Sequence, residues 1–386
     1  MPVLNSAAQM KEEISEWRRA LHRNPELMFD VGQTAAFVAG KLAEFGCDEI
    51  VQGLGRTGVV GLIRGRGGNG PTIGLRADMD ALPIHETTGK PWTSANPGRM
   101  HACGHDGHTS MLLGAARHLC ETRNFRGAVA VIFQPAEEGG GGGREMVKDG
   151  LMDRFAIGEV YGMHNLPGLP VGRFAIRKGP IMASTDEFTV TVRGRGSHAA
   201  LPHAAIDPVV TGSAIVTALQ TIAARNTDPL DSAVVSVTKF HAGDAYNVIS
   251  ETAELAGTVR TLRPATRDLV ERRIREIVNG VAAAHGAEAE IDYDRNYPVT
   301  VNHPEQTGRA AEAAAAVAGK AAIDTETPPL MAGEDFSYML EARPGAFIFI
   351  GNGETAGLHH PAYDFNDDVI PYGVSYWTAL AESLLA

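Results

Sequence analysis

The sequence predicts an α/β fold in which a larger domain with a largely parallel sheet is interrupted by a smaller inserted α+β domain. Towards both ends of the chain, short apolar runs bounded by Gly, Pro or charged residues alternate with helical stretches. That alternation is typical of buried parallel strands joined by helices. In the middle of the chain, apolar and polar residues alternate by twos, which is typical of strands with one face in water.

The larger domain begins with a predicted helix over residues 8–22, where apolar residues recur at spacings of three and four. Asn24 and Pro25 end this helix, because proline disfavours helical backbone before it. Buried strands follow at residues 57–63, 72–76, 128–133 and 159–163. A helix over residues 108–121 lies between the second and third of them. After the insertion come helices at 306–318 and 336–341, a strand at 346–350 and a last helix beyond 371.

The inserted domain covers residues 184–294 and has the order β-α-β-β-α-β of the ferredoxin-like split motif. Two of its strands are predicted at 187–193 and 233–240, and its helices at 208–224 and 266–285. The larger domain is then made of both ends of the chain, residues 1–183 and 295–386.

The composition argues against several classes of protein, among them nucleic-acid-binding and membrane-spanning proteins. The 386 residues include 34 Lys+Arg against 46 Asp+Glu, so the formal net charge is −12 and no basic cluster indicates a nucleic-acid surface. No apolar run approaches the roughly 18 residues of a membrane span, and the N-terminus lacks a signal-peptide pattern. Three cysteines are too few for a disulfide framework. We expect a cytoplasmic protein with a small polar substrate or a protein partner, and no nucleic acid or membrane.

Candidate metal ligands are concentrated in residues 101–108, HACGHDGH, which hold three histidines, a cysteine and an aspartate. Further polar residues follow predicted strands: Asp80, the pair Glu137 and Glu138, and His164. The functional crevice of an open α/β sheet lies outside the carboxyl ends of its strands, so these side chains should converge. The sequence therefore predicts a metal site at this edge.

The two adjacent glutamates are predicted to have different roles. Neighbouring side chains on extended backbone point in opposite directions, so one carboxylate can bind a metal while the other remains available as a base. A carboxylate beside a metal-bound water is what metal-assisted hydrolysis requires. The alternative reading is that Glu137 and Glu138 begin an exposed loop, since glycines 139–143 follow them.

Six motifs in this order resemble one enzyme family: HACGHDGH, QPAEEGGGG, YGMHNLP, GRGSHAALPH, GEDFSYM and LHHPAYDFND. They are similar to the metal-dependent N-acyl amino acid amidohydrolases, in the hippurate hydrolase and auxin-conjugate hydrolase branch of the aminoacylase and carboxypeptidase G superfamily. The resemblance runs the length of the chain. It implies a catalytic domain that binds two divalent metal ions per subunit, and an inserted lid domain that joins subunits into a homodimer or homotetramer.

The resemblance also implies roles for single residues. The metal ligands it implies are Cys103, His105, Glu138, His164 and His359. The neighbouring His360 leaves the last choice open, although His359 fits the motif better. Glu137 is the implied general base, and Asp80 is the implied partner that orients a ligand. Thiolate favours Zn²⁺, while carboxylate and imidazole also suit Mn²⁺, with Co²⁺ or Ni²⁺ as further candidates.

Three residues of the inserted domain complete the implied site. His198, in GRGSHAALPH, would stabilise the oxyanion, either within its own subunit or from a partner subunit. Asn247 and Arg260 would hold the carboxylate of the amino acid, a task for which the guanidinium group is well suited. From spacing alone these three residues carry no clear signal.

The expected activity is hydrolysis of the amide bond of N-acyl-L-amino acids, with hippurate (benzoyl-glycine) as the first candidate substrate. A metallo-dipeptidase or an N-acetyl-diaminopimelate deacetylase is an alternative within the same resemblance. A cysteine hydrolase using Cys103 is a second class, and it should survive metal removal. A third class is a metal-storage or ligand-binding protein on a decayed catalytic fold. The intact Glu137 argues against this class.

Overall fold

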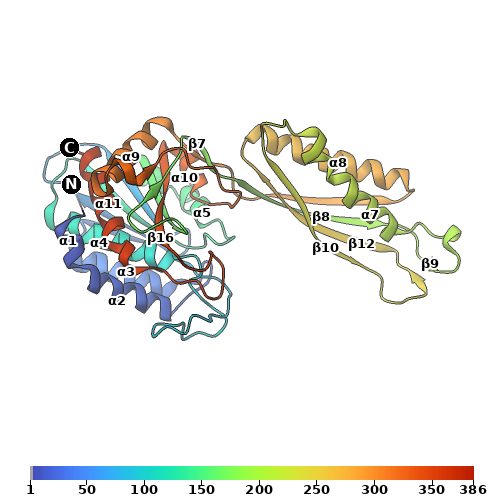
Figure 1. Cartoon of the computed structure of the whole chain (residues 1–386), viewed down its shortest axis with the longest axis horizontal. Coiled ribbons are helices and arrows are strands. Elements are labelled where there is room, and N and C mark those ends of the chain that lie inside the picture. The colour runs from blue at the N-terminus through green and yellow to red at the C-terminus, as the bar shows by residue number, and fades with distance from the viewer. Residues whose placement is uncertain (1–2) are drawn as a thin grey trace. The chain divides into compact units, whose positions relative to one another are not determined.

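A computed structural model describes residues 3–386, which fall into two compact units (Figure 1). The first unit comprises the described residues up to Ile181, together with Val301–Pro328 and Asp335–Ala386. The second comprises Met182–Thr300 and Pro329–Glu334. Residues 1 and 2 of the predicted larger domain lie outside the described residues.

The first unit is built on an eight-stranded sheet of order β1-β2-β4-β3-β5-β16-β6-β15. Its strands are β1 (Glu49–Leu54), β2 (Gly58–Arg64), β3 (Thr72–Asp78), β4 (Ala128–Gln134), β5 (Ile157–Pro167), β6 (Phe174–Ala175), β15 (Ile323–Asp324) and β16 (Gly345–Gly353). The four central strands, β4, β3, β5 and β16, are parallel, whereas β1 and β2 pair antiparallel at one edge. The predicted α/β class with a largely parallel sheet is confirmed.

The helices of this unit are α1 (Asn5–Gln9), α2 (Lys11–Arg23), α3 (Gly32–Phe45), α4 (His105–Thr122), α5 (Gly142–Lys148), α6 (Leu151–Arg154), α9 (Pro304–Ala318), α10 (Ser337–Ala342) and α11 (Ile370–Leu384). Helix α4 packs against α2, α3 and α11, and α11 also packs against α9. The single helix predicted over residues 8–22 is divided at Met10, and α3 and β1 had no counterpart in the prediction.

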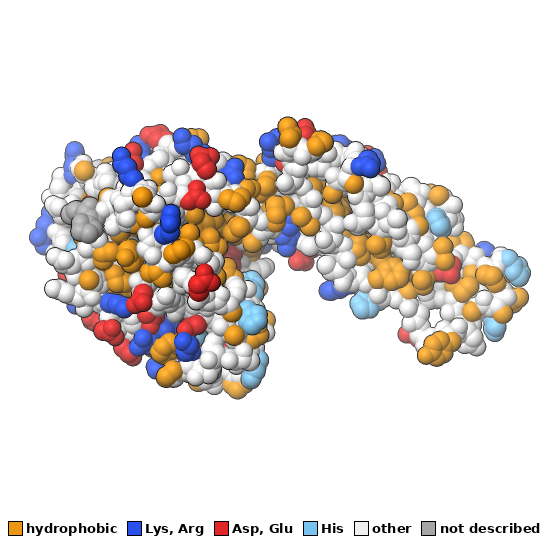
Figure 2. Space-filling view, in the orientation of Figure 1, with side chains coloured by type: hydrophobic (Ala, Val, Ile, Leu, Met, Phe, Trp, Pro, Cys, Tyr) orange, Lys and Arg blue, Asp and Glu red, His pale blue; other side chains and the backbone are white. Residues whose placement is uncertain are grey.

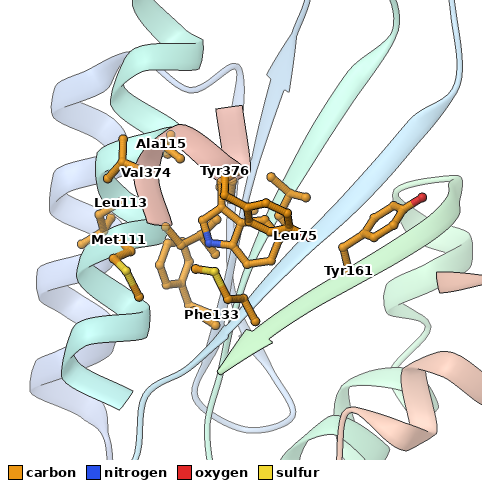
Figure 3. Packing of buried hydrophobic residues seen from close by; sticks show 14 of the residues in the cluster. Leu75, Met111, Leu113, Ala115, Phe133, Tyr161, Val374 and Tyr376 are labelled. Carbon is orange, nitrogen blue, oxygen red and sulfur yellow. The ribbon is translucent and has the colours of Figure 1, made fainter. Parts of the chain in front are cut away.

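Packing between α4, α11 and the sheet forms the main core of the first unit (Figure 3). Leu75 and Phe133 from the strands, Met111 from α4 and Val374 from α11 are fully buried. Gly373 permits the close approach of α11 to α4, because a Cβ there would lie 2.2 Å from the sulfur of Met111. This core holds the start of α4 at the carboxyl ends of β3, β4 and β5.

The second unit is a four-stranded antiparallel sheet of order β10-β12-β8-β13 with two helices. Its elements are β8 (Ser184–Arg193), α7 (Pro208–Leu219), β10 (Ala233–Ala242), β12 (Thr252–Thr261), α8 (Pro264–Ala284) and β13 (Glu288–Arg295). Their order along the chain is the predicted β-α-β-β-α-β. Residues 329–334 join this unit because the carbonyl groups of Leu330 and Ala332 accept hydrogen bonds from the Ala183 N–H.

Shorter elements complete the structure. They are β7 (Gly179–Met182), β9 (Ser197–His198), β11 (Val248–Ile249), β14 (Thr300–Asn302), three 3₁₀ turns (Pro202–Ala204, Lys320–Ala322 and Asp367–Val369) and a π-helical turn (Ile222–Asn226). The helix predicted over 208–224 therefore ends as an α-helix at Leu219 and continues only as the separate π-helical turn.

The surface of the first unit carries acidic and basic side chains interspersed over the face shown in Figure 2, without a patch of either sign. None of the described helices combines the length and the apolar composition needed to cross a membrane.

Candidate metal centre

The segment HACGHDGH forms a tight turn that leads directly into α4. Gly104 sits at the helix start with φ +95°, a left-handed conformation that favours glycine. A Cβ at this position would lie 2.3 Å from Nδ2 of Asn165 and 2.6 Å from the hydroxyl of Tyr363. Glycine is therefore required at position 104 for two reasons, the left-handed backbone conformation and the lack of space for a side chain. Cys103 and His105 flank Gly104 in this turn.

The five predicted ligands lie together in the first unit. Cys103 Sγ is 3.4 Å from His164 Nε2. Glu138 Oε1 is 3.9 Å from His105 Nε2 and 3.3 Å from His359 Nε2. Among these five ligands, two sets of three are each close enough to hold one metal ion, namely Cys103 with His105 and His164, and Cys103 with Glu138 and His359. Because Cys103 belongs to both sets, the arrangement suits two neighbouring ions.

Hydrogen bonds fix the tautomers of two histidines. His105 Nδ1 lies 2.8 Å from the backbone carbonyl of Asp80, and His164 Nδ1 lies 2.7 Å from the carbonyl of Asn165. A carbonyl oxygen only accepts, so each Nδ1 carries a proton, and Nε2 is the ring atom that would bind a metal ion. Both Nε2 atoms face the donors described above, as metal-binding imidazoles do.

The third histidine of the motif is engaged elsewhere. His108 Nδ1 is 2.7 Å from a carboxylate oxygen of Asp78, and His108 Nε2 accepts the backbone N–H of Asn165 at 3.0 Å. Both ring nitrogens are therefore occupied by protein groups. His108 supports the site but has no lone pair left for a metal.

A buried nitrogen atom without a hydrogen bond in the described part of the chain, and the negative charge around it, indicate that these side chains suit a metal ion. The Nε2 of His105 is buried and accepts no hydrogen bond from any described residue. Burial raises the pKa of the Cys103 thiol, and the carboxylates of Glu138 and Glu137 raise it further. Burial lowers the pKa of His105, but nearby carboxylates, Asp78 foremost, outweigh burial and raise it to about 10. These carboxylates favour positive charge here, and the S, N and O donors are those of zinc and related cations.

Asp80 holds the two adjacent glutamates. The backbone N–H of Glu137 donates to one oxygen of Asp80 at 2.9 Å, and that of Glu138 donates to the other at 3.1 Å. The expectation of extended backbone at the pair is wrong, because both residues lie in a turn that follows Ala136 at φ +52°. A turn lets both N–H groups face one carboxylate, which extended backbone does not.

The loop after β16 directs His359 rather than His360 towards Glu138. His359 has φ +63°, and its N–H donates to the carbonyl of Ala102 at 2.8 Å, next to Cys103. The ring of His360 instead accepts the N–H of Ala362 through Nδ1 at 3.0 Å. This geometry favours His359 as the ligand.

Comparison with known proteins decides the family. The profile of peptidase family M20/M25/M40 matches residues 74–383. The chain belongs to this family. It is a hydrolase that acts on amide bonds, as the predicted class requires.

Several relatives match nearly the whole chain. It is 42% identical to the hippurate hydrolase of Campylobacter jejuni, over 99% of both chains. It is 38% identical to an N-acetyldiaminopimelate deacetylase of Halalkalibacterium halodurans, over 97% of this chain and 100% of that one. A solved Bacillus subtilis protein, described as a dinuclear metal-binding peptidase of the M20 family, has a TM-score of 0.86 and 36% identity over 98% of this chain and 99% of that one.

Two residues without a predicted role connect the parts of this candidate site. The side-chain amide of Asn165 donates to the carbonyl of Cys103 at 2.6 Å, and the hydroxyl of Tyr363 donates to the amide oxygen of Asn165 at 2.7 Å. Both side chains are buried. They lie within the motifs YGMHNLP and LHHPAYDFND, but an amide and a phenol carry no ligand signal of their own.

Tyr363→Phe is expected to weaken metal binding by about 10-fold to 100-fold, the range for partners that orient ligands. The variant keeps the ring but frees the Asn165 amide, which then no longer holds the Cys103 turn in one orientation. Competition for Zn²⁺ against a chromophoric chelator measures the change.

Tyr376→Phe is the matched control for this prediction. Tyr376 is also fully buried, but its hydroxyl makes no hydrogen bond to any residue that the structure describes. Its removal should leave zinc affinity unchanged. Equal affinities for all three proteins would contradict a role for Tyr363 in holding the ligands.

The remaining predicted site residues belong to the second unit. His198 is exposed on β9, and its Nδ1 accepts the N–H of Ala200 at 3.1 Å. Asn247 precedes β11, the strand paired with β9. Arg260 is half-buried on β12 and donates to the Val259 carbonyl at 3.0 Å. Their roles towards the substrate stay predictions.

Proposed function

We propose that this M20 hydrolase is an N-acyl-L-amino acid amidohydrolase that works with two divalent metal ions and prefers hippurate. The observation that carries the proposal is the pair of donor sets that share Cys103, with Glu137 on the turn next to them. Cys103, His105, Glu138, His164 and His359 would hold the ions. Bound Mn²⁺ or Zn²⁺ would polarise the acyl carbonyl and lower the pKa of a bound water to roughly 7.

Each residue of the site has its own role in the proposed reaction. Glu137 accepts a proton from the attacking water and returns it to the leaving amine, which separates the carboxylic acid from the free amino acid. Asp80 keeps Glu137 in place through the backbone hydrogen bond. His198 donates a hydrogen bond to the oxyanion, and Asn247 and Arg260 bind the carboxylate of the substrate.

The second unit is proposed as a lid and as the surface through which subunits associate, as a homodimer or a homotetramer. A closing lid would exclude water and bring His198 to the acyl carbonyl. His198 could serve its own subunit or a partner's site, and complementation between a His198 variant and a Glu137 variant in mixed dimers separates these two arrangements. Recovered activity in the mixed dimer would place His198 in the partner's site.

Hippurate is the first substrate because the hippurate hydrolase relative matches the chain end to end. The deacetylase relative supports N-acetyl-diaminopimelate as the second candidate. The two substrates differ in the acyl group, benzoyl against acetyl, and in the charge of the amino acid side chain. Their ratio of kcat/KM therefore reports the combined preference for the acyl group and the amino acid.

A substrate panel tests the proposal. The purified protein is stripped with a chelator and its metal content measured, then Mn²⁺ or Zn²⁺ is restored separately. Release of free amino acid is followed from hippurate, N-acetyl-diaminopimelate and a dipeptide. We expect activity only with metal and the highest kcat/KM on hippurate.

Other outcomes of the panel are equally informative. A higher kcat/KM on N-acetyl-diaminopimelate or on the dipeptide would replace hippurate and keep the class. Undiminished activity in protein shown to be free of metal would overturn the two-metal proposal and favour Cys103 as a nucleophile.

A further inference from the structure

Two cysteines lie in contact outside the metal centre. Cys47 follows α3 and its C-terminal Gly46, and Cys120 lies in the last turn of α4. Their sulfur atoms are 3.6 Å apart, although the residues are 73 positions apart in the sequence. The third cysteine, Cys103, belongs to the candidate metal centre.

The contact is close to what a disulfide needs. The sulfur atoms must approach from 3.6 Å to a bond length of about 2.05 Å. Both cysteines lie at element ends, where small side-chain and backbone adjustments are easiest. Cys47 is half-buried and Cys120 is buried.

The surroundings of the pair favour one thiolate. Arg123 donates to the carbonyl of Gly46 and to the carboxylate of Asp48, both at 2.7 Å, so its guanidinium group lies against the segment that carries Cys47. The hydrogen bond between the two sulfurs lowers the pKa of Cys120 and raises that of Cys47, and Arg123 lowers that of Cys120 further. The thiolate is the form that reacts with oxidants.

We propose that Cys47 and Cys120 are an oxidation site, at which a hydroperoxide converts the two thiols into an intramolecular disulfide. The thiolate of the pair attacks a peroxide oxygen, the O–O bond breaks, and a sulfenic acid and water form. The other cysteine then attacks the sulfenic sulfur and releases a second water. In total two thiols lose two electrons and two protons, and one hydrogen peroxide is reduced to two waters.

The disulfide would join the end of α4 to the segment after α3. Closing so long a loop restricts the unfolded chain, so an unstrained bond raises the midpoint of thermal unfolding. Helix α4 has 18 residues and begins at His105. Cys120 lies 15 residues after His105, so the bond forms about 22 Å from this candidate ligand, and oxidation should stabilise the protein without inactivating it.

Peptide mapping of the metal-loaded protein tests the site. After hydrogen peroxide is added in equimolar amount, we expect the intact mass to fall by two hydrogen atoms. Digestion without reductant should yield the Cys47 peptide linked to the Cys120 peptide, and dithiothreitol should separate them. The oxidised protein should also have a higher Tm than the reduced protein.

Cys47→Ser and Cys120→Ser serve as controls, since each should abolish the linked peptide and the gain in Tm. The mapping of the unsubstituted protein needs neither variant, so a folding defect in one of them does not affect the test. A linked peptide containing Cys103, oxidation of either cysteine only to sulfinic acid, or no loss of mass would overturn the proposal. None of these readouts depends on the substrate or on the proposed hydrolysis.

Discussion

Glu137→Gln should lower kcat on the order of 10³-fold while the protein keeps its full metal content. General acid–base catalysis contributes roughly 10²-fold to 10⁴-fold, and glutamine can neither accept nor return the proton. The amide is nearly isosteric, and the backbone hydrogen bond from residue 137 to Asp80 does not involve the side chain. Steady-state kinetics on hippurate, together with metal analysis of the same sample, measures both quantities.

Two further glutamate variants serve as comparisons for Glu137→Gln. Glu138→Gln should lose metal as well as activity, because Glu138 Oε1 lies 3.3 Å from His359 Nε2 inside a donor set. Glu145→Gln should change neither, because Glu145 lies on α5 and pairs at 3.6 Å with the exposed Arg56. Near-normal turnover of metal-loaded Glu137→Gln would show that another group is the base.

Cys103→Ser should have the second large effect, a loss of metal from both positions and a fall in kcat/KM of about 10²-fold or more. Cys103 is the one donor common to the two sets, so its replacement weakens both. A hydroxyl is a poorer ligand than a thiolate for Zn²⁺. Elemental analysis after gel filtration gives the number of ions per chain.

Cobalt substitution adds a readout that does not depend on activity. A thiolate bound to Co²⁺ gives an intense charge-transfer band, which should be present in the unsubstituted protein and absent from Cys103→Ser. Cys120→Ser is the matched control, since Cys120 is a buried cysteine at the far end of the helix that His105 begins. It should keep both ions and the band. Two retained ions and full activity in Cys103→Ser would contradict the assignment.

Elements with strong apolar patterns could be predicted, and weakly patterned ones could not. Strand β4 is a nearly continuous apolar run, and β3 and β5 contain shorter ones, because these central strands are largely buried on both faces. Helix α3 went unpredicted because much of its buried face consists of small residues, including Thr34, Ala35 and Ala39. Strand β1 lies at the sheet edge and is mostly exposed, so it lacks both an apolar run and an alternation.

The residues of the candidate metal centre could be predicted from the sequence to lie together, but the differences among them could not. HACGHDGH, the glutamates after β4 and His164 towards the carboxyl end of β5 identify which side chains meet, since parallel strands bring their carboxyl ends to one edge. Sequence spacing treats His105 and His108 alike. Only the partners of their ring nitrogens separate a histidine with a lone pair to offer from one already bonded to Asp78 and Asn165.

Local pattern and chain connectivity were sufficient to predict the α/β class, the order of the strongly patterned elements and the residue types at the site. Tertiary structure decided what depends on contacts between distant segments. It brought Tyr363 to Asn165, placed both glutamate N–H groups on Asp80 and set Cys47 against Cys120. Hydrogen bonds and sulfur contacts act over about 3 to 4 Å, so only the folded chain reveals which groups they join.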